Sequence, residues 1–522
     1  MSDPFYITTP IYYPNAEPHL GHVYTTLAAD TVARYYRLCG RETHFLTGVD
    51  EHGIKMVKTA AAQGLEPKQL ADRVVPVFSD LWKELGISND DFLRTSSPRH
   101  HAGVQEVVRR LLANGDIYPG SYEGWYDEGQ EEFVTETEAK NNNFNSAISG
   151  RPLVRFSEKS YFFKLSRYAP RVLAHIEAYP HFVQPQSRRN EVVSKLKAGV
   201  EDLSISRATL KWGIPMPNDP EHVVYVWIDA LSNYITALGF GSADDSAMRK
   251  FWPANVHLIG KEILWFHAVY WPAMLMSLDL ELPKCVFAHG WWTSQGRKMS
   301  KSLGNYIDLA KLREVIARCG IDALRFYLLR AAPFGTDLDW TDADFNKSYT
   351  ELADVVGNCL NRVLNMIGRY RGGKIPPATG PADSSDRHLL DAIAALPAAL
   401  ENAYAKMELQ HAAMLPLELA RAANGYIEAT APFKLAKDPT KADRLDTVLH
   451  NSARAMHAAL VGLLPMLPEK ARDGLTQLGV SAELATLAEL FARPSPVGTA
   501  CGAAQVLFPK HETGEAAKGK PG

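Results

Sequence analysis

Residues 5–53 read FYITTPIYYPNAEPHLGHVYTTLAADTVARYYRLCGRETHFLTGVDEHG, and this stretch decides the fold. Phe5–Tyr13 is rich in β-branched and aromatic residues, which is typical of a strand. Gly21–Leu38 has helical periodicity, and Gly40 follows it as a stop signal. Thr43–Gly48 reads as a second strand. A strand, a helix and a strand within about 45 residues predict a βαβ unit with parallel strands and a right-handed crossover.

The residues that follow the strands are the first candidates for a site. In parallel sheets, ligands bind outside the carboxyl ends of the strands. We therefore single out Ile11 and Tyr13, His19 to His22, and Asp50 to His52.

The rest of the chain divides by composition. The stretch 116–220 combines Gly- and aromatic-rich segments with a polar loop, and we expect it to be an insertion with a small sheet of its own. Val223–Trp227, Val256–Ile259 and Val286–Gly290 read as strands of the second half of the parallel sheet. After about residue 345 helical periodicity dominates, interrupted by the Gly-, Pro- and Ser-rich stretch Gly372–Asp386.

These patterns predict an α/β fold, a Rossmann-like doubly wound parallel sheet with an inserted connective domain, followed by an all-α domain. The expected boundaries are 1–115 and 221–295 for the two halves of the sheet domain, 116–220 for the insertion, 296–345 for a loop and stem region, 346–508 for the helical domain and 509–522 for a disordered tail.

Composition narrows the class of protein. The formal net charge of −3 gives the whole chain no nucleic-acid character, so any RNA contact needs a local basic patch. The five cysteines form no CxxC pair, which excludes a thiolate zinc knuckle and gives no disulfide framework. No apolar run reaches the roughly 18 residues that span a bilayer, and no secretory signal is present. We expect a cytoplasmic protein without membrane contact.

His19-Leu20-Gly21-His22 falls at the first strand-to-helix junction. Unpaired backbone N–H groups and the helix dipole favour an anion there, and Gly21 lets the backbone approach a flat ring. His19 and His22 project to one side and could hydrogen-bond a phosphoryl group. Taken alone, two such histidines are more often capping or packing residues than functional ones.

Lys298-Met299-Ser300-Lys301-Ser302 is the second motif. Two lysines and two hydroxyls in five residues suit a loop that closes over a pyrophosphate leaving group, although a solvated basic loop is the usual reading of such a stretch. HLGH followed by KMSKS resembles the class I aminoacyl-tRNA synthetases, which activate an amino acid with ATP. The interval 23–297 is too short for the large editing insertion of the isoleucyl, valyl and leucyl enzymes. For the cysteine-ligated zinc site of the cysteinyl enzymes it has only Cys39 and Cys285.

What remains resembles the methionyl-tRNA synthetase family over nearly the whole chain, to about residue 500. The segments that carry the resemblance are Ile11-Tyr12-Tyr13-Pro14-Asn15, Thr47–Gly53, Val226–Tyr234, which is similar to a strand marked by a tryptophan in that family, and Gly260–Ile263 with Phe266-His267.

The resemblance implies the substrates L-methionine, ATP and tRNA(Met), with Mg²⁺ held largely by the phosphates. It implies catalysis by His19, His22, Lys298 and Lys301, and ATP binding by these four with Gly21, Gly260, Glu262 and Ser300. Asp50 would pair with the α-ammonium group. The side chain of methionine would contact Ile11, Tyr13, Trp227, Ala230, Leu231, Tyr234, Ile263 and His267. Without the family, each aromatic residue reads as core packing and Glu262 as a surface residue.

In the helical domain, Asn358 and Arg362 match the family's anticodon-reading positions. Pro432-Phe433 stands where relatives usually carry Pro-Trp, so the smaller ring would stack on an anticodon base. Arg369, Arg371 and Lys374 add positive charge for phosphates.

The chain departs from many relatives in the insertion, where residues 116–220 contain no cysteine. We therefore expect no structural zinc, and we expect a monomer, because the chain ends in a short tail rather than an added oligonucleotide-binding domain. A small-molecule nucleotidyltransferase and a synthetase-like binding module without catalysis are the competing readings.

Overall fold

The computed structural model describes residues 3–129, 131–294, 296–299, 307–380, 383–483, 485–493 and 497–509. The chain forms two compact units. The first comprises Met1–Ala33 and Glu42–Trp291, and the second comprises Arg34–Arg41 and Trp292–Gly522.

A six-stranded parallel sheet lies at the centre of the first unit, in the order β3-β2-β1-β12-β13-β7. Its strands are β1 (Phe5–Tyr12), β2 (Thr43–Val49), β3 (Asp91–Arg94), β7 (Val183–Gln184), β12 (Val256–Gly260) and β13 (Val286–His289). β1 lies between β2 and β12, where the strand order reverses, and ligands bind at the carboxyl ends beside such a switch point. The predicted βαβ unit and the predicted strands at 256–259 and 286–290 are confirmed.

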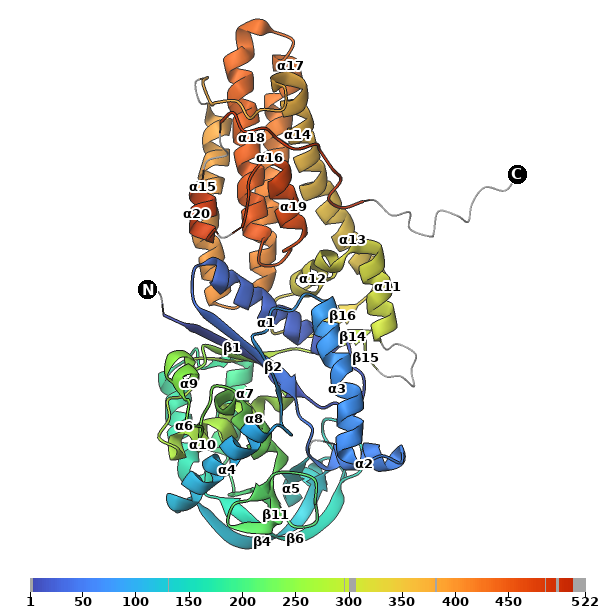
Figure 1. Cartoon of the computed structure of the whole chain (residues 1–522), viewed down its shortest axis with the longest axis vertical. Coiled ribbons are helices and arrows are strands. Elements are labelled where there is room, and N and C mark those ends of the chain that lie inside the picture. Colours follow the sequence, from blue (N-terminus) through green and yellow to red (C-terminus); the bar gives the residue numbers. More distant parts are fainter. Residues whose placement is uncertain are drawn as a thin grey trace, which may run out of the picture. The chain divides into compact units, whose positions relative to one another are not determined.

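The central strands are buried along almost their whole length, as expected for a parallel sheet that helices cover on both faces. Figure 1 shows helices on either side of this sheet. The helices of the first unit are α1 (Leu20–Leu38, which continues into the second unit), α2 (Ile54–Ala62), α3 (Pro67–Glu84), α4 (Pro98–Ala113), α5 (Glu136–Asn141), α6 (Leu165–Ala178), α7 (Gln186–Lys197), α8 (Val226–Thr236), α9 (Ser246–Phe251), the 3-10 turn η1 (Lys261–Ile263), the π-helical turn η2 (Phe266–Tyr270) and α10 (Trp271–Ser277).

The prediction of a parallel strand at Val223–Trp227 is wrong. Only Val223 and Val224 of this run are strand residues. They end β11 (Asp219–Val224), which pairs antiparallel with β9 (Ser206–Arg207) and β10 (Pro215–Met216) in a separate sheet. Trp227 lies in α8, a helix whose residues are almost all buried. A short apolar run that is buried on every side has no periodicity, so the sequence cannot distinguish a strand from a helix there.

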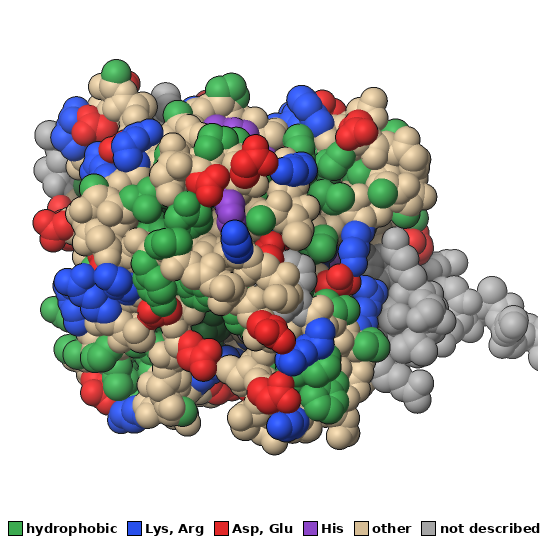
Figure 2. All heavy atoms as spheres, turned by 90° about the horizontal axis from the view of Figure 1, so that it is seen from below, with side chains coloured by type: hydrophobic (Ala, Val, Ile, Leu, Met, Phe, Trp, Pro, Cys, Tyr) green, Lys and Arg blue, Asp and Glu red, His purple; other side chains and the backbone are tan. Residues whose placement is uncertain are grey.

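The expected insertion is not separate from the parallel sheet. Its own four-stranded sheet has the order β5-β4-β6-β8, with β4 (Ile117–Asp127), β5 (Glu132–Val134), β6 (Val154–Phe163) and β8 (Leu203–Ser204). However, β7 also comes from residues 116–220, and it pairs with β13 at the edge of the main sheet. β7 has only two residues, too few to leave a strand pattern in the sequence. On the face seen in Figure 2, acidic and basic side chains are interspersed with apolar ones.

The second unit is mainly helical. A three-stranded sheet comes first, with β14 (Trp292–Ser294), β15 (Arg297–Lys298) and β16 (Leu338–Trp340). The helices are α11 (Leu309–Cys319), α12 (Ile321–Arg330), α13 (Asp342–Glu351), the π-helical turn η4 (Leu352–Gly357), α14 (Asn358–Arg371), α15 (Ser384–Ala405), α16 (Leu409–Thr430), α17 (Pro432–Leu435), η5 (Pro439–Lys441), α18 (Ala442–Leu463), α19 (Lys470–Gln477) and α20 (Leu487–Ala492). Helices α15, α16 and α18 pack on one another, and α18 is buried over most of its length.

The helical prediction for this unit is confirmed, since the described residues after Trp340 form no strand beyond an isolated bridge between Lys374 and Ala500. The predicted linker matches the segment between α14 and α15, which begins at Gly372 with a positive φ of 61°. Of the predicted tail, 509–522, the structure describes Pro509, whose carbonyl accepts the hydroxyl of Tyr349 at 2.7 Å, and residues 510–522 lie outside the described residues. Among the described helices, none is long and apolar enough to cross a bilayer.

Candidate active site at the carboxyl edge of the sheet

His19 and His22 lie where the loop after β1 enters α1. Their rings stack with centroids 3.7 Å apart. The backbone N–H of His19 donates to Nδ1 of His22 (3.2 Å), and the N–H of Gly21 donates to Nδ1 of His19 (3.0 Å). Because each Nδ1 accepts a hydrogen bond, a neutral ring carries its hydrogen on Nε2.

The environment keeps His22 neutral. Burial, and then the neighbouring His19, lower the pKa of His22 well below its ordinary value. The His22 ring also contacts Tyr12 and Phe78, at 4.7 and 5.6 Å between centroids. The neutral His22 ring therefore presents an Nε2–H donor at the N-terminus of α1, with the His19 ring stacked on it, where the helix dipole favours an anion.

Asp50 follows β2 and is only 3% exposed. Its Oδ1 accepts the backbone N–H of His52 at 3.2 Å. Burial, and then the negative charge of Asp229, raise the pKa of Asp50 well above its ordinary value. A buried carboxyl group in this state gains much from a cation brought against it.

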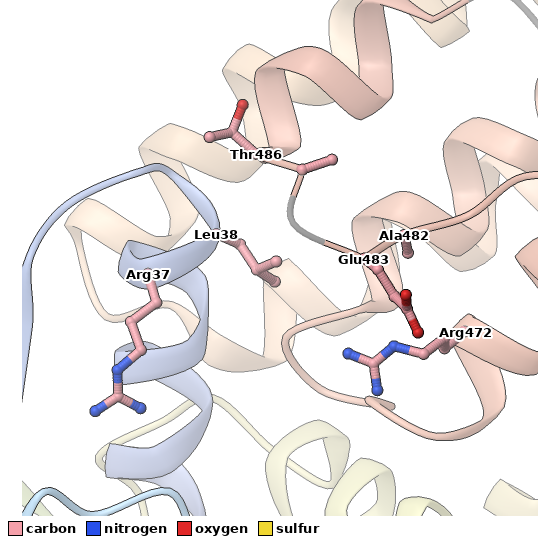
Figure 3. Close-up of a pocket in the computed structure, with 7 residues that line it drawn as sticks. Arg37, Leu38, Arg472, Ala482, Glu483 and Thr486 are labelled. Carbon is pink, nitrogen blue, oxygen red and sulfur yellow. The ribbon is translucent and has the colours of Figure 1, made fainter.

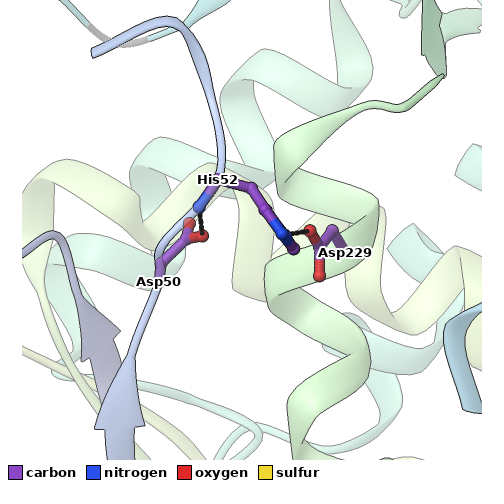
Figure 4. Close-up of side chains that lie close together, drawn as sticks. All are labelled: Asp50, His52 and Asp229. Carbon is purple, nitrogen blue, oxygen red and sulfur yellow. Dashed lines mark hydrogen bonds and ion pairs between the residues drawn. The ribbon is translucent and has the colours of Figure 1, made fainter. Parts of the chain in front are cut away.

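Asp229, on α8, contacts two buried histidines, His52 and His100, and its contact with His52 is drawn in Figure 4. His52 Nδ1 lies 2.6 Å from Asp229 Oδ2, and His100 Nε2 lies 2.7 Å from Asp229 Oδ1. Burial alone would raise the pKa of Asp229, but His52 and His100 outweigh it and hold that pKa below its ordinary value. Thr236 lies 2.7 Å from the second ring nitrogen of His100.

Asp50, His52 and Asp229 are also a group of donors that could hold a metal ion, and within the described residues no other such group occurs. The nitrogen of His52 that faces the group is engaged with Asp229, and Asp50 accepts a backbone N–H. The donor set is thus satisfied by internal hydrogen bonds, and we interpret it as a positioning network rather than a metal centre.

Trp227 and His267 belong to two neighbouring helical segments. Trp227 stacks on Phe266, with centroids 3.7 Å apart and an angle of 5° between the planes, and its ring meets the edge of His267. His267 Nδ1 lies 2.9 Å from the carbonyl oxygen of Ile263, and its Nε2 lies 2.7 Å from the hydroxyl of Tyr234.

Burial lowers the pKa of His267 to about 4, so this side chain is neutral at pH 7. A carbonyl can only accept, which places the ring hydrogen on Nδ1 and makes Nε2 the acceptor for the hydroxyl of Tyr234. His267 also lies in the π-helical turn η2, an irregularity that often accompanies functional sites.

The predicted methionine contacts differ in burial. Ile11, Tyr13, Trp227 and Ile263 are partly exposed, whereas Ala230, Leu231, Tyr234 and His267 are buried. Tyr13, Trp227 and Ile263 pack against the core of the first unit. Tyr234 is thus a core residue, as expected without the family, whereas Trp227 is partly exposed, as a contact for a ligand must be.

Gly260 ends β12, and Glu262 follows in η1. The Glu262 carboxylate folds over Gly260, so a Cβ at position 260 would lie 2.5 Å from Oε1. Trp291 Nε1 donates to Glu262 Oε2 at 2.6 Å, and the ammonium of Lys261 lies 4.3 Å from the centroid of Trp291. Glu262 is therefore a partly buried, hydrogen-bonded residue at the carboxyl end of a strand, not a plain surface glutamate.

The KMSKS motif begins in the second unit, in a hairpin in which Lys298 of β15 pairs with Thr293 of β14. Of Lys298 the structure describes the backbone alone. Ser300, Lys301 and Ser302 lie outside the described residues.

Asn358 and Arg362 are exposed on one face of α14, as predicted from their spacing. Asn358 Nδ2 donates to Asp354 Oδ1 at 3.0 Å, and Arg362 Nη1 donates to Asn424 Oδ1 at 3.3 Å. Pro432 is buried, whereas Phe433 exposes 53% of its surface.

Arg371, which is expected from the sequence to add positive charge for phosphates, makes contacts within the second unit. Its guanidinium pairs with Asp446 and donates to the carbonyls of Tyr370 (2.7 Å) and Ala442 (3.2 Å). Arg371 therefore ties α14 to the start of α18 and is occupied within the unit.

A separate open pocket of about 710 Å³ lies in the second unit, beside the last turn of α1 (Figure 3). It is lined by Arg37, Leu38, Arg472, Ala482, Glu483, Ala485 and Thr486. None of the predicted site residues is among them.

Comparisons with known proteins identify the family. The sequence pattern of the family described as tRNA synthetases class I (M) matches residues 5–142 and 137–364. The methionine–tRNA ligase of Caldanaerobacter subterraneus subsp. tengcongensis is 44% identical over 511 residues, which cover 98% of this chain and 79% of the relative. That of Enterococcus faecalis is 46% identical over 493 residues, covering 92% and 73% of the two chains.

The chain belongs to the methionine–tRNA ligase family. A solved structure of Mycobacterium tuberculosis methionyl-tRNA synthetase in complex with methionyl-adenylate superposes with a TM-score of 0.92 at 39% identity, covering 98% of this chain and 100% of that one. The α/β fold with a helical C-terminal region is thus the fold of the methionine–tRNA ligase family.

Sequence reasoning gave no role to several residues that surround the predicted ones. His52, Asp229 and Phe266 stood inside the quoted segments without a role, and His52 was singled out because it follows the second strand. His100 and Trp291 stood in none of these segments. His100 had no signal in the sequence, since only the packing of α4 on α8 brings it to Asp229.

Proposed function

We propose that the carboxyl edge of the parallel sheet binds methionine and ATP and joins them as methionyl-adenylate. As a member of the methionine–tRNA ligase family, the chain is a class I aminoacyl-tRNA synthetase by activity, which transfers the methionyl group to the 3′ end of tRNA(Met) and releases AMP and pyrophosphate. The observation that carries the assignment of the site is the buried Asp50, two residues before His52 and beside the strand that leads to His19 and His22.

For methionine, Asp50 is the acceptor of the α-ammonium group. Two observations support this role: Asp50 is buried, and its pKa lies above the ordinary value. The anion of such a carboxyl group is stabilised when an ammonium group binds beside it. The thioether lies against the partly exposed aromatic Trp227 and the neutral His267. Sulfur–aromatic contacts of this kind contribute about 0.3–1.5 kcal/mol each. The remaining contacts in the proposal are Ile11, Tyr13, Ala230, Leu231, Tyr234 and Ile263.

For ATP, His19 and His22 donate from Nε2 to the phosphates, in line with their Nδ1 atoms being acceptors for backbone N–H groups. Gly21 gives close access to the backbone, and Gly260 with Glu262 binds the ribose. The KMSKS residues Lys298, Ser300 and Lys301 are assigned to the pyrophosphate on their motif alone. Mg²⁺ enters with the phosphates of ATP.

The reaction needs no protein nucleophile. The carboxylate of methionine attacks the α-phosphorus in line, the bond to pyrophosphate breaks, and a mixed anhydride forms. The enzyme contributes orientation and hydrogen-bond donors to the charge that develops on the phosphoryl oxygens. The 3′-terminal ribose hydroxyl of tRNA then attacks the anhydride, and AMP leaves.

For tRNA, α14 and α17 supply the anticodon contacts. Asn358 and Arg362 are exposed and four residues apart, which supports hydrogen bonding to bases, and the exposed ring of Phe433 supports stacking. Pro432, which is buried, fixes the start of the short helix that presents this ring.

Three further properties belong to the proposal: the protein is a cytoplasmic monomer and holds no structural zinc. The sequence supports the last, since residues 116–220 contain no cysteine. Stoichiometric zinc in purified protein would contradict it, and sedimentation would reveal a dimer.

The first test replaces one phosphate donor. His22→Ala should lower the rate of methionine-dependent adenylate formation by about 10²–10³-fold, the usual effect of losing one transition-state donor, while the affinity for methionine stays within about twofold. Lys301→Ala should behave alike. If rate and methionine affinity fall together, the histidine has a structural role instead.

The second test separates the enzyme classes. A small-molecule nucleotidyltransferase would not charge tRNA with methionine, and a binding module would show no methionine-dependent exchange of pyrophosphate. Charging of tRNA(Met) by the purified chain excludes both.

A further inference from the structure

The methionine site proposed above has two parts on different elements. Asp50, the acceptor of the ammonium group, follows β2. Four of the proposed side-chain contacts lie on α8: Trp227, Ala230, Leu231 and Tyr234. A substrate that contacts both parts must match the distance between them. A contact that fixes the position of α8 relative to the loop after β2 therefore also fixes the length of the amino-acid side chain that fits.

Asp229 makes that connection. It belongs to α8, and through Oδ2 it holds His52 of the β2 loop at 2.6 Å. The backbone N–H of the same His52 donates to Asp50 Oδ1. Asp229 and Asp50 are therefore linked through one residue, in the arrangement drawn in Figure 4.

The position of Asp229 on α8 suits this purpose. At about 100° per residue, Trp227, Leu231 and Tyr234 lie about 140–200° around the helix from Asp229. One face of α8 thus carries these three proposed methionine contacts, and the opposite face carries the carboxylate that anchors the helix. A rotation or shift of α8 would move both together.

A second anchor prevents such a shift. His100 of α4 lies 2.7 Å from the other oxygen of Asp229, and the far nitrogen of this ring meets Thr236 at the end of α8. Helices α4 and α8 can approach this closely because position 103 is glycine, where a Cβ would lie 2.4 Å from Thr236 Cγ2. All of His52, His100 and Asp229 are buried, so water does not compete for these bonds.

We infer that Asp229 is a positioning residue that sets the spacing between the ammonium acceptor and the side-chain pocket, and thereby the selectivity for the length of the amino-acid side chain. The inference rests on the proposed function of the site. Asp229 touches neither substrate, and it acts through His52 and through the placement of α8.

The test is steady-state pyrophosphate exchange with Asp229→Asn, using methionine, ethionine (one methylene longer) and S-methylcysteine (one methylene shorter) as probes. Hydrogen bonds to a charged group are worth enough to predict a KM for methionine about 10–150-fold higher. The KM for ATP should stay within about twofold and kcat within about threefold, because the reacting groups are untouched. The preference for methionine over the two analogues, normally about 10–200-fold for one methylene, should fall at least about fivefold.

Matched histidine variants keep the test decisive if Asp229→Asn folds poorly. The amide of His52→Asn places a donor where Nδ1 stood, and that of His100→Gln places one where Nε2 stood, so both should retain near-normal KM and selectivity. His52→Leu and His100→Leu fill the space without a donor and should match the defect of Asp229→Asn. If the rings serve packing alone, the leucine variants will be the better enzymes, which would overturn the inference.

Asp322→Asn is the control for the loss of a buried aspartate. Asp322 belongs to the second unit, where its carboxylate accepts the N–H groups of Glu469 and Lys470 at the start of α19. This variant should lose thermal stability and keep the selectivity for methionine. Unchanged KM and selectivity in folded Asp229→Asn, or an equal loss for ATP and all three amino acids, would overturn the inference. Absence of methionine-dependent exchange in the unaltered chain would instead contradict the proposed function.

Discussion

Replacing Asp50 by asparagine should weaken the binding of methionine and, at the same time, stabilise the fold of the free protein. The amide has the size of the carboxyl group, and its oxygen can still accept the N–H of His52, so the change removes little besides the charge. In the complex, that charge is the partner of a desolvated ammonium group. Breaking a buried pair by removing one partner costs about 3–5 kcal/mol, which is a loss of about 150- to 5,000-fold in affinity for methionine.

In the free protein, the same change should stabilise the fold. Burial and the charge of Asp229 raise the pKa of Asp50, which means that folding disfavours its ionised form. The unfolded carboxyl group ionises near pH 3.9, so the penalty is absent in acid, grows as pH rises toward the folded pKa, and stays constant above it. Asparagine avoids the penalty, and we expect a gain of about 1 kcal/mol, or about 2 °C in Tm, at pH 8.

The assays are isothermal titration calorimetry with methionine and thermal unfolding at pH 4 and pH 8. The expected pattern is lost affinity, a higher Tm at pH 8 and a smaller difference at pH 4. Retained affinity would remove Asp50 from the ammonium role. A lower Tm at both pH values would mean that the charged carboxylate is a stabilising element of the free fold, contrary to the reasoning from its burial.

Three other predictions concern separate parts of the molecule. Methionine binding should release protons at pH values between the raised pKa of Asp50 in the free protein and its lower pKa beside the ammonium group, so the affinity for methionine should fall as pH falls through the raised pKa. Calorimetry in buffers of different ionisation enthalpy measures this release, and a binding enthalpy that does not depend on the buffer would contradict it. Phe433→Ala should weaken tRNA binding about 5–150-fold, the value of one base–aromatic stack, and leave methionine-dependent pyrophosphate exchange unchanged; equal tRNA affinity by filter binding would exclude stacking. Gly103→Ala should destabilise the protein by about 1–3 kcal/mol despite alanine's higher helix propensity, because the new methyl group would lie 2.4 Å from Thr236 Cγ2. Gly425→Ala in α16 faces open space and should stabilise the protein by about 0.5–1 kcal/mol. Urea unfolding measures both changes, and the same sign for both would refute the packing argument.

Much of the fold was predictable because the first βαβ unit carries strong local patterns. The β-branched strands, the amphipathic α1 and the glycine that follows it all point to the same structure. Val223–Trp227 failed for the opposite reason. The run is apolar throughout, and tertiary packing alone decides that its end belongs to a buried helix.

Candidate site residues could be found in the sequence where a functional side chain follows a strand or its loop. Asp50 and Glu262 come one and two residues after the ends of β2 and β12, and His19 ends the loop that leads from β1 to α1, so topology brings all three to one edge of the sheet. His100 could not be found, since it belongs to a helix that no motif marks and reaches Asp229 only through the contact of α4 with α8. Likewise, the sequence shows Arg371 as one of several local positive charges, and it does not reveal the partner Asp446, which is 75 residues away in sequence.

The central claim is that this site activates methionine, and it is tested most directly by ATP–pyrophosphate exchange measured separately with each of the twenty amino acids. The account predicts exchange that depends on methionine, with the other amino acids near the level seen without any. Exchange that another amino acid supports better, or that proceeds equally with none, would contradict the assignment of Asp50, Trp227 and His267 to methionine.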